Sequence, residues 1–180
     1  ILMGVVFNAA DGTVLFDTSN YDRYINTQAT VTDLDHDGIA ELLASDGAYD
    51  PGGTRLWPFL ISGDANRVDV VPAQLDTDPE GEVALVMYGA DYTGFVAHDT
   101  DGTLLRDPVD LSEEGTPGPP CAADLDLDGR MDVVVPQQYA VQALTPDGTL
   151  LWRVEGDDDS SRAGCTVSDL DGDGRVEILY

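Results

Sequence analysis

The chain has 180 residues, of which 42% are hydrophobic, and 35 acidic against 8 basic side chains give it a formal net charge of −27. Such a chain is not expected to bind nucleic acid or an anionic membrane surface, because like charges repel. No apolar run is long enough for a transmembrane helix, so no membrane insertion by this segment is expected. Bound cations would explain the excess of acids, and so would solubility or adaptation to salt.

Two sequence elements recur along the chain. The first is an acidic stretch of nine residues that starts at 33, 74, 124 and 169, with spacings of 41, 50 and 45. The second reads DGTVLF at 11–16, DGTLLR at 101–106 and DGTLLW at 147–152, and its missing copy is placed at SGDANRVDV, 62–70. A period of about 45 residues is typical of one four-stranded blade of a β-propeller. The four acidic stretches are DLDHDGIAE (33–41), QLDTDPEGE (74–82), DLDLDGRMD (124–132) and DLDGDGRVE (169–177).

Each repeat is predicted to contain four short strands. One strand precedes the acidic stretch and a second follows it, as in GCTVS and ILY around the last copy. The following strands are apolar at consecutive positions, which indicates strands covered on both faces. Two further strands are joined at Asp-Gly, which predicts a tight primed hairpin turn. Since no convincing helical period occurs, the chain is predicted to be all-β with about 14–16 strands.

The predicted architecture is a β-propeller of four-stranded blades, with about four blades' worth of sequence in a single domain, 1–180. The Pro- and Gly-rich stretch 106–120 is expected to be a long loop between blades. A closed four-bladed ring and part of a larger ring, of seven or eight blades for example, both fit. We favour the larger ring, in a longer polypeptide, because the pattern is cut at both ends. The repeat units are approximately 1–27 (partial), 28–69, 70–119, 120–163 and 164–180 (partial).

The spacing of the acids within three of the stretches predicts calcium binding. Carboxylates occupy positions one, three, five and nine, glycine occupies position six, and the backbone carbonyl of position seven can add an oxygen. Five or six oxygens from one flexible loop suit Ca²⁺, and Mg²⁺ ranks second because it prefers small octahedral sites. The predicted ligands are Asp33, Asp35, Asp37, Ile39 and Glu41; Asp124, Asp126, Asp128, Arg130 and Asp132; and Asp169, Asp171, Asp173, Arg175 and Glu177.

The stretches differ from an EF-hand loop, which requires a bidentate Glu at position twelve. Position twelve holds Ala44, Val135 or Tyr180 in these three copies. The sequences VSDLDGDGRVEILY and VTDLDHDGIAELLA instead resemble the FG-GAP/VCBS repeats of integrin-α-like β-propellers. The resemblance covers essentially the whole chain, although the FG and GAP flanks are absent. It implies a propeller with Ca²⁺ between the first two strands of each blade.

The second acidic stretch departs from this pattern. Gln74 occupies position one, and Pro79 replaces the glycine at position six, where proline cannot adopt a positive φ. We therefore expect a weak or empty metal site there, with Asp76, Asp78 and Glu82 as the remaining ligands. The chain is predicted to hold about three calcium ions, with a fourth, degenerate site.

Cys121 and Cys165 lie at nearly equivalent places before the third and fourth acidic stretches. A disulfide between them would fit an oxidising compartment. We favour two small buried residues, because strands of neighbouring blades are expected to lie too far apart for the Cα separation of about 4.4–6.8 Å that a disulfide needs.

The resemblance implies a non-catalytic scaffold for cell adhesion or recognition, and no catalytic motif supports enzymatic activity. The expected location is extracellular, cell-surface or periplasmic, and the expected partner is a protein or glycan at a cell surface. Two alternatives remain open. One is a carbohydrate-binding or polysaccharide-cleaving Ca²⁺-dependent propeller, and the other is a quinoprotein-type dehydrogenase, suggested by DGTLLW at 147–152.

Overall fold

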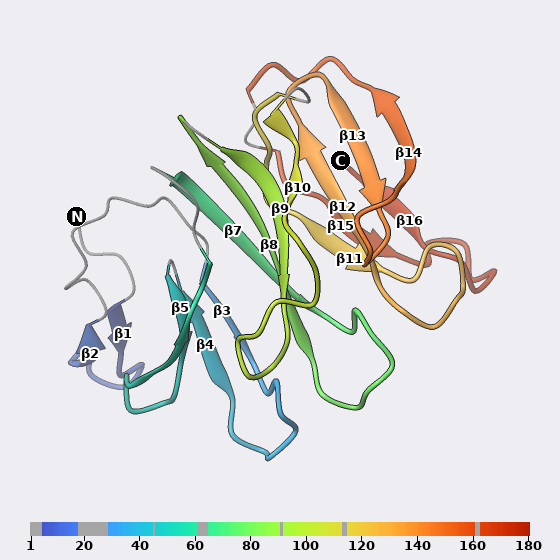
Figure 1. The fold of residues 1–180 in the computed structure, drawn as a ribbon. Coiled ribbons are helices and arrows are strands. Elements are labelled where there is room, and N and C mark those ends of the chain that lie inside the picture. Colours follow the sequence, from blue (N-terminus) through green and yellow to red (C-terminus); the bar gives the residue numbers. More distant parts are fainter. Residues whose placement is uncertain are drawn as a thin grey trace.

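The computed structural model describes residues 5–17, 29–44, 46–60, 65–90, 92–112, 115–160 and 163–180. These residues form 16 strands, which agrees with the predicted all-β class and strand number. Within each sheet, successive strands pair antiparallel, so each sheet is a meander (Figure 1). Among the described residues, no helix is long and apolar enough to cross a membrane.

The strands belong to five sheets. The first and last sheets have two strands each: β1 (Val5–Phe7) with β2 (Val14–Asp17), and β15 (Thr166–Ser168) with β16 (Glu177–Leu179). The three middle sheets have four strands each: β3 (Thr30–Thr32), β4 (Glu41–Ala44), β5 (Gly47–Tyr49) and β6 (Arg55–Pro58); β7 (Ala65–Ala73), β8 (Glu82–Gly89), β9 (Thr93–His98) and β10 (Val109–Asp110); β11 (Cys121–Ala123), β12 (Asp132–Gln137), β13 (Ala140–Leu144) and β14 (Leu150–Glu155).

The sheets pack face to face in the order of the sequence, and a separate apolar cluster fills each of the four interfaces. The first strands of the middle sheets contact one another, and β11 also contacts β15. Figure 1 shows the sheets side by side, with β1–β2 at one end of the series and β15–β16 at the other. The described residues form no closed ring, so the propeller architecture goes beyond what they establish.

The second strand of each middle sheet is buried on both faces, as its consecutive apolar residues predict. In β8, Val83, Leu85 and Met87 face the β3–β6 sheet. Ala84 and Val86, on the opposite face, pack against the β11–β14 sheet. Each of these five side chains is 1% exposed or less, and burying a side chain of the size of Val or Leu stabilises the fold by about 1.5–3 kcal/mol.

The hairpin turns differ from the predicted primed turns. Beyond β5, Gly53 donates its N–H to the Asp50 carbonyl at 3.0 Å, and Asp50 donates to the Thr54 carbonyl at 2.9 Å. Gly53 has a φ of +83°, in the left-handed region. This is typical of hairpin loops longer than two residues, in which a turn is followed by a left-handed glycine. The missing copy of this element is therefore at 50–57, and its placement at 62–70 was wrong, because 65–70 belong to β7. Gly102 and Gly148 repeat the same positive φ and hydrogen bond, whereas Gly12 has the positive φ but donates to the Asn8 carbonyl, four residues back.

The stretch 106–120 is not a loop throughout. Val109 and Asp110 form β10, which pairs with Phe95 and Gly94 of β9. Pro117 makes an isolated bridge with Gln137. The proline-rich composition concealed this edge strand, because prolines are tolerated beside short edge strands.

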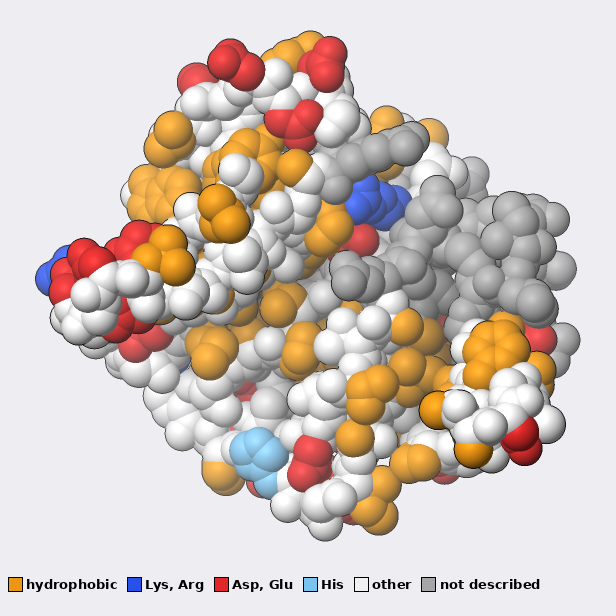
Figure 2. All heavy atoms as spheres, turned by 180° about the vertical axis from the view of Figure 1, so that it is seen from behind, with side chains coloured by type: hydrophobic (Ala, Val, Ile, Leu, Met, Phe, Trp, Pro, Cys, Tyr) orange, Lys and Arg blue, Asp and Glu red, His pale blue; other side chains and the backbone are white. Residues whose placement is uncertain are grey.

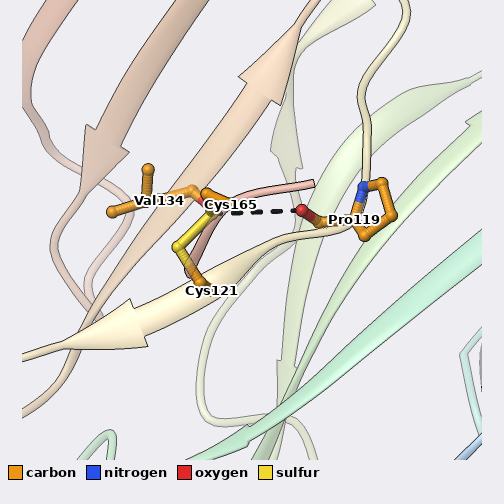
Figure 3. The surroundings of a disulfide bond; sticks show 4 residues. All are labelled: Pro119, Cys121, Val134 and Cys165. Atoms are coloured by element: carbon orange, nitrogen blue, oxygen red, sulfur yellow. Dashed lines mark hydrogen bonds between the residues drawn. A yellow bond between two sulfur atoms is a disulfide. The ribbon is translucent and has the colours of Figure 1, made fainter. Parts of the chain in front are cut away.

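A disulfide joins Cys121 of β11 to Cys165, which directly precedes β15. Our expectation of two separate cysteines was wrong, because these first strands are in contact and their Cα atoms are 5.6 Å apart. Figure 3 shows the bridge beside Val134 and the backbone carbonyl of Pro119. The Cys165 Sγ lies 3.6 Å from the Val134 oxygen and 4.0 Å from the Pro119 oxygen. The bond thus fixes the last two sheets to each other.

A buried histidine links the sheets that contain β6 and β9. The His98 Nε2 accepts a hydrogen bond from the Leu60 N–H at 3.1 Å, which requires a proton on Nδ1 for the bond to the Gly102 carbonyl at 3.0 Å. The ring lies against Trp57 and Phe59, with centroid distances of 5.4 and 6.0 Å. Burial holds the pKa of His98 below its ordinary value, so the neutral ring is the form that joins the two sheets.

Removing the disulfide should destabilise the chain substantially. It closes a loop with a sequence separation of 44, so the variant Cys121→Ala/Cys165→Ala should lose about 2–4 kcal/mol of unfolding free energy. Urea unfolding followed by tryptophan fluorescence measures this loss. The wild-type chain in reductant serves as the control and should unfold like the double variant. An unchanged midpoint in both cases would contradict the cross-link.

His98 should make stability fall at mildly acidic pH. Its pKa is lowered in the fold, so below about pH 6.5 the unfolded chain binds the proton first and the unfolding free energy decreases as the pH falls. The variant His98→Gln keeps one donor and one acceptor but cannot titrate, so its stability should vary less between about pH 7 and 5.5. Urea unfolding at constant free calcium compares the two slopes. Equal slopes would exclude this role of His98.

Candidate metal centres

The four acidic stretches connect the first and second strands of four successive sheets. They lie between β3 and β4, β7 and β8, β11 and β12, and β15 and β16, and we call them loops 1 to 4. Equivalent connections leave antiparallel sheets at the same end, and Figure 1 shows the loops following one edge of the molecule in sequence order. Figure 2 shows the acidic side chains of one face gathered in separate groups near its margin, with few basic side chains.

Position one organises loops 1, 3 and 4 in the same way. In loop 1, the Asp33 Oδ2 accepts the N–H of Gly38 at 3.0 Å. The corresponding bonds, Gly129 to Asp124 and Gly174 to Asp169, measure 3.0 and 2.9 Å. The three glycines have φ values of +89°, +93° and +87°, which confirms that position six requires a left-handed backbone.

Position nine has a structural role that the sequence did not reveal. One oxygen of the acid at this position accepts a hydrogen bond from the backbone N–H of the leucine at position two. This bond joins the two ends of the loop. The distances are 2.8 Å for Leu34 to Glu41, 2.9 Å for Leu125 to Asp132 and 2.7 Å for Leu170 to Glu177. Leu75 and Glu82 make the same bond in loop 2. The acid at position nine thus has one oxygen tied to the backbone and a second available for a ligand.

Each of the four loops brings three carboxylates together, with one oxygen from each within 4.8 Å of the others. The predicted ligands Glu41, Asp128 and Asp173 stand outside these groups of three. Asp128 instead pairs with Arg130 at 2.8 Å, and hydrogen bonds from the side chain and backbone of Arg130 lower the pKa of its carboxyl. The groups are Asp33, Asp35 and Asp37; Asp76, Asp78 and Glu82; Asp124, Asp126 and Asp132; and Asp169, Asp171 and Glu177.

Position seven donates its N–H to the carboxylate at position five in all four loops. The distances are 2.7 Å from Ile39, 2.8 Å from Arg130 and 2.8 Å from Arg175. In loop 2 the donor is Glu80, at 3.1 Å. These bonds shape the loops, and the role of the carbonyls at position seven as ligands remains a prediction.

A second left-handed residue was not recognised in the sequence. At position four, His36 and Leu127 have φ values of 59° and 63°, and Gly172 has 80°. Residues other than glycine seldom adopt this conformation, so His36 and Leu127 introduce local backbone strain into loops 1 and 3. Only Gly172 offered a signal in the sequence.

Two buried carboxylate oxygens have no hydrogen-bond partner in the described part of the chain: Asp33 Oδ1 and Glu82 Oε1. Leaving such atoms unsatisfied is costly. A cation bound to the loops would satisfy them, and a donor set made only of oxygens fits Ca²⁺. Burial also raises the pKa of Asp132, and it raises that of Glu82 to about 7.

A groove of about 450 Å³ lies beside loops 1 and 2. Its lining includes Asp35, Glu80, Asp99 and Asp101, together with Trp57. The negative lining favours cations or uncharged ligands over anions.

The fold and site thus define a class: stacked antiparallel sheets with an acidic loop between the first two strands. No protein-family model and no curated protein sequence matches the chain significantly. Solved structures, in contrast, do match the chain. The rhamnogalacturonan lyases YesX and YesW match over 97% of this chain, with 20% and 19% identity and TM-scores of 0.63 and 0.62. The biofilm matrix protein Bap1 of V. cholerae matches over 80%, with 21% identity and a TM-score of 0.56.

These similarities concern the fold. The chain spans 38% and 39% of the length of the two lyases and 22% of that of Bap1. They do not establish the FG-GAP/VCBS resemblance. They do correct the prediction that the protein is not an enzyme, because that prediction rested on absent motifs while two structures with this fold are lyases.

The backbone conformation at position six should matter independently of side-chain packing. A Cβ at Gly129 would meet nothing within 4 Å, yet its φ is +93°, so Gly129→Ala should cost about 1 kcal/mol of unfolding free energy. Gly81→Ala is the matched control: its Cβ would make ordinary contacts from 3.6 Å and its φ is not left-handed. Thermal unfolding compares the two variants, and equal losses would contradict the conformational explanation.

Proposed function

We propose that this chain is a calcium-stabilised β-propeller segment, of FG-GAP/VCBS type, in an extracellular protein that interacts with polysaccharide or matrix. The observation that carries the proposal is the recurrence of one carboxylate cluster at the same connection of four successive sheets. A solvated turn would not leave a buried oxygen such as Asp33 Oδ1 unpaired.

The calcium ions would act as structural cross-links. Each group contains three carboxylates whose mutual repulsion opposes the folded loop. A bound cation converts this repulsion into attraction and fixes the two strands that the loop connects. The sheets, held together by their apolar faces, would be the blades of the propeller.

Two further observations support the proposed location and partner. The Cys121–Cys165 disulfide is of a kind that persists in oxidising environments outside the cytosol. The structures with this fold include a biofilm matrix protein and two polysaccharide lyases, which supports a glycan or matrix component as the partner. Whether such a protein binds or cleaves its partner depends on residues beyond the repeated loops.

Calcium should raise the melting temperature, and chelation should lower it, because the ion binds the folded chain preferentially. One site at a hundredfold excess of calcium over its dissociation constant contributes about 2.7 kcal/mol. Asp171→Asn/Asp173→Asn should reduce the calcium-dependent shift. The control Asp157→Asn/Asp159→Asn removes the same charge from exposed positions outside the loops and should retain the shift.

Calorimetry with calcium or chelator measures these shifts, and a melting temperature indifferent to both would refute calcium stabilisation. Affinity electrophoresis in calcium tests the partner, with mobility retarded by a polysaccharide as the expected result. Unchanged mobility across neutral and acidic polysaccharides would contradict the glycan assignment while leaving calcium stabilisation intact.

A further inference from the structure

A flat side chain of one sheet packs on the hairpin-turn glycine of the next sheet, and this contact recurs along the series. Between the β3–β6 and β7–β10 sheets, a Cβ added to Gly102 would lie 2.7 Å from the Trp57 ring. Only glycine leaves room for so close an approach. The pairs, in chain order, are Phe16 with Gly53, Trp57 with Gly102, and the Arg106 guanidinium with Gly148.

One glycine and one flat side chain of this kind have no counterpart in these pairs. Four stretches combine Gly-Thr with a flat side chain four residues after the glycine, at 12–16, 53–57, 102–106 and 148–152. A Cβ on Gly12 would meet nothing within 4 Å. Trp152 occupies the place of Trp57, because each pairs with a buried alanine of the third strand. Trp57 is 8% exposed, whereas Trp152 is only partly buried. Gly12 and Trp152 are thus the unmatched halves of a fourth contact.

Phe7 of β1 is uncovered in the same way. It pairs with Val14, two residues after the turn glycine. The residues in the equivalent place of the complete sheets pack against the preceding sheet, and Phe7 is 54% exposed. Those residues are Tyr49, His98 and Leu144, which are 2%, 1% and 2% exposed. Phe7 and Gly12 therefore form a surface that lacks a preceding sheet among the described residues.

The two-stranded sheets are complementary halves of one complete sheet. The acidic loop identifies β15–β16 as the first two strands of a sheet, and the Gly-Thr turn identifies β1–β2 as the last two. Among the described residues, β16 pairs only with β15. Leu179 of β16 is 65% exposed, whereas its equivalents in the complete sheets are 0% exposed. These equivalents are Leu43, Ala84 and Val134.

We propose that two copies of this chain associate head to tail, with β1–β2 of one copy completing the β15–β16 sheet of the other. Both halves are present on this chain, yet they lie at opposite ends of the series (Figure 1), so a second copy can supply what each end lacks. The added hairpin extends the sheet beside β16 in the strand order of the complete sheets. Trp152 then packs on Gly12 and Phe7 of the second copy, continuing the contact that already joins the sheets.

This association has a defined size. Each copy supplies three complete sheets and two halves, so two copies supply eight complete sheets. Head-to-tail contacts form a ring where the rotation closes, and eight is a number of blades that the sequence allows. The inference goes beyond the proposed function, because it requires neither bound calcium nor a glycan.

Sedimentation equilibrium of the 180-residue chain tests the association. The net charge of −27 opposes contact between copies, so the measurement is made at about 1 M salt, where the Debye length is about 3 Å. The expected mass is twice that of one chain. The variant Gly12→Ala should weaken association about tenfold or more, because its Cβ would overlap Trp152 of the other copy. Gly129→Ala is the matched control, with the same left-handed backbone and an open Cβ position in loop 3.

A second pair of variants avoids backbone strain at the turn. Phe7→Ser changes a side chain that is exposed in a single copy, so it should weaken association while the fold is retained. Its control, Leu127→Ser, alters a side chain of similar exposure, 58%, in loop 3. A doubled mass that both end variants reduce and both controls preserve supports the proposal.

The contrary outcomes are equally distinct. A single-copy mass at all concentrations overturns the association, and so does a doubled mass that neither Gly12→Ala nor Phe7→Ser reduces. A single-copy mass with tryptophan emission altered by Gly12→Ala would show that the two ends meet within one copy. None of these results bears on calcium stabilisation, which is measured by the calcium-dependent melting temperature.

Discussion

Burial of the second strands on both faces is the constraint on which the rest of the structure depends. A strand such as β8 cannot leave either face in water, because Val83 and Ala84 point to opposite sides and both are fully buried. It therefore needs a sheet on each side, and those sheets have the same requirement. The result is a series of sheets in sequence order, each one presenting its first connection at the same edge.

This stacking creates an electrostatic problem at that edge. The chain carries 35 acids and 8 bases, and some bases form ion pairs outside the loops, such as Arg67 with the buried Asp69. The loops therefore use their own backbone N–H groups to hold carboxylates in place. These N–H groups reach only some of the carboxylate oxygens. Asp33 Oδ1 and Glu82 Oε1 are buried and receive no hydrogen bond. A divalent cation bound to the loops would supply the positive charge that neither arginine nor the backbone provides there.

Patterns confined to one strand or loop were predictable from the sequence. The consecutive apolar residues of β8 and β12 indicated burial on two faces, and glycine at position six indicated a positive φ. Features that depend on two segments far apart in the sequence could not be predicted in this way. To predict the disulfide, one would have to know how close β11 lies to the residue before β15, and no local sequence pattern contains that distance. The hairpin turn at 50–53 was missed because Pro51 and Gly52 interrupt the Asp-Gly signal.

Loop 2 shows that two departures from the loop pattern can compensate for each other. Gln74 and Pro79, judged separately, each remove a feature of the metal-binding pattern. Judged together, they remove the two halves of one hydrogen bond, and the path of the chain is held by a different bond from Gln74. The carboxylates that converge there lie outside the exchanged positions, and the most buried of them, Glu82, is also part of β8. The position of this carboxylate group thus depends on β8 as well as on the loop.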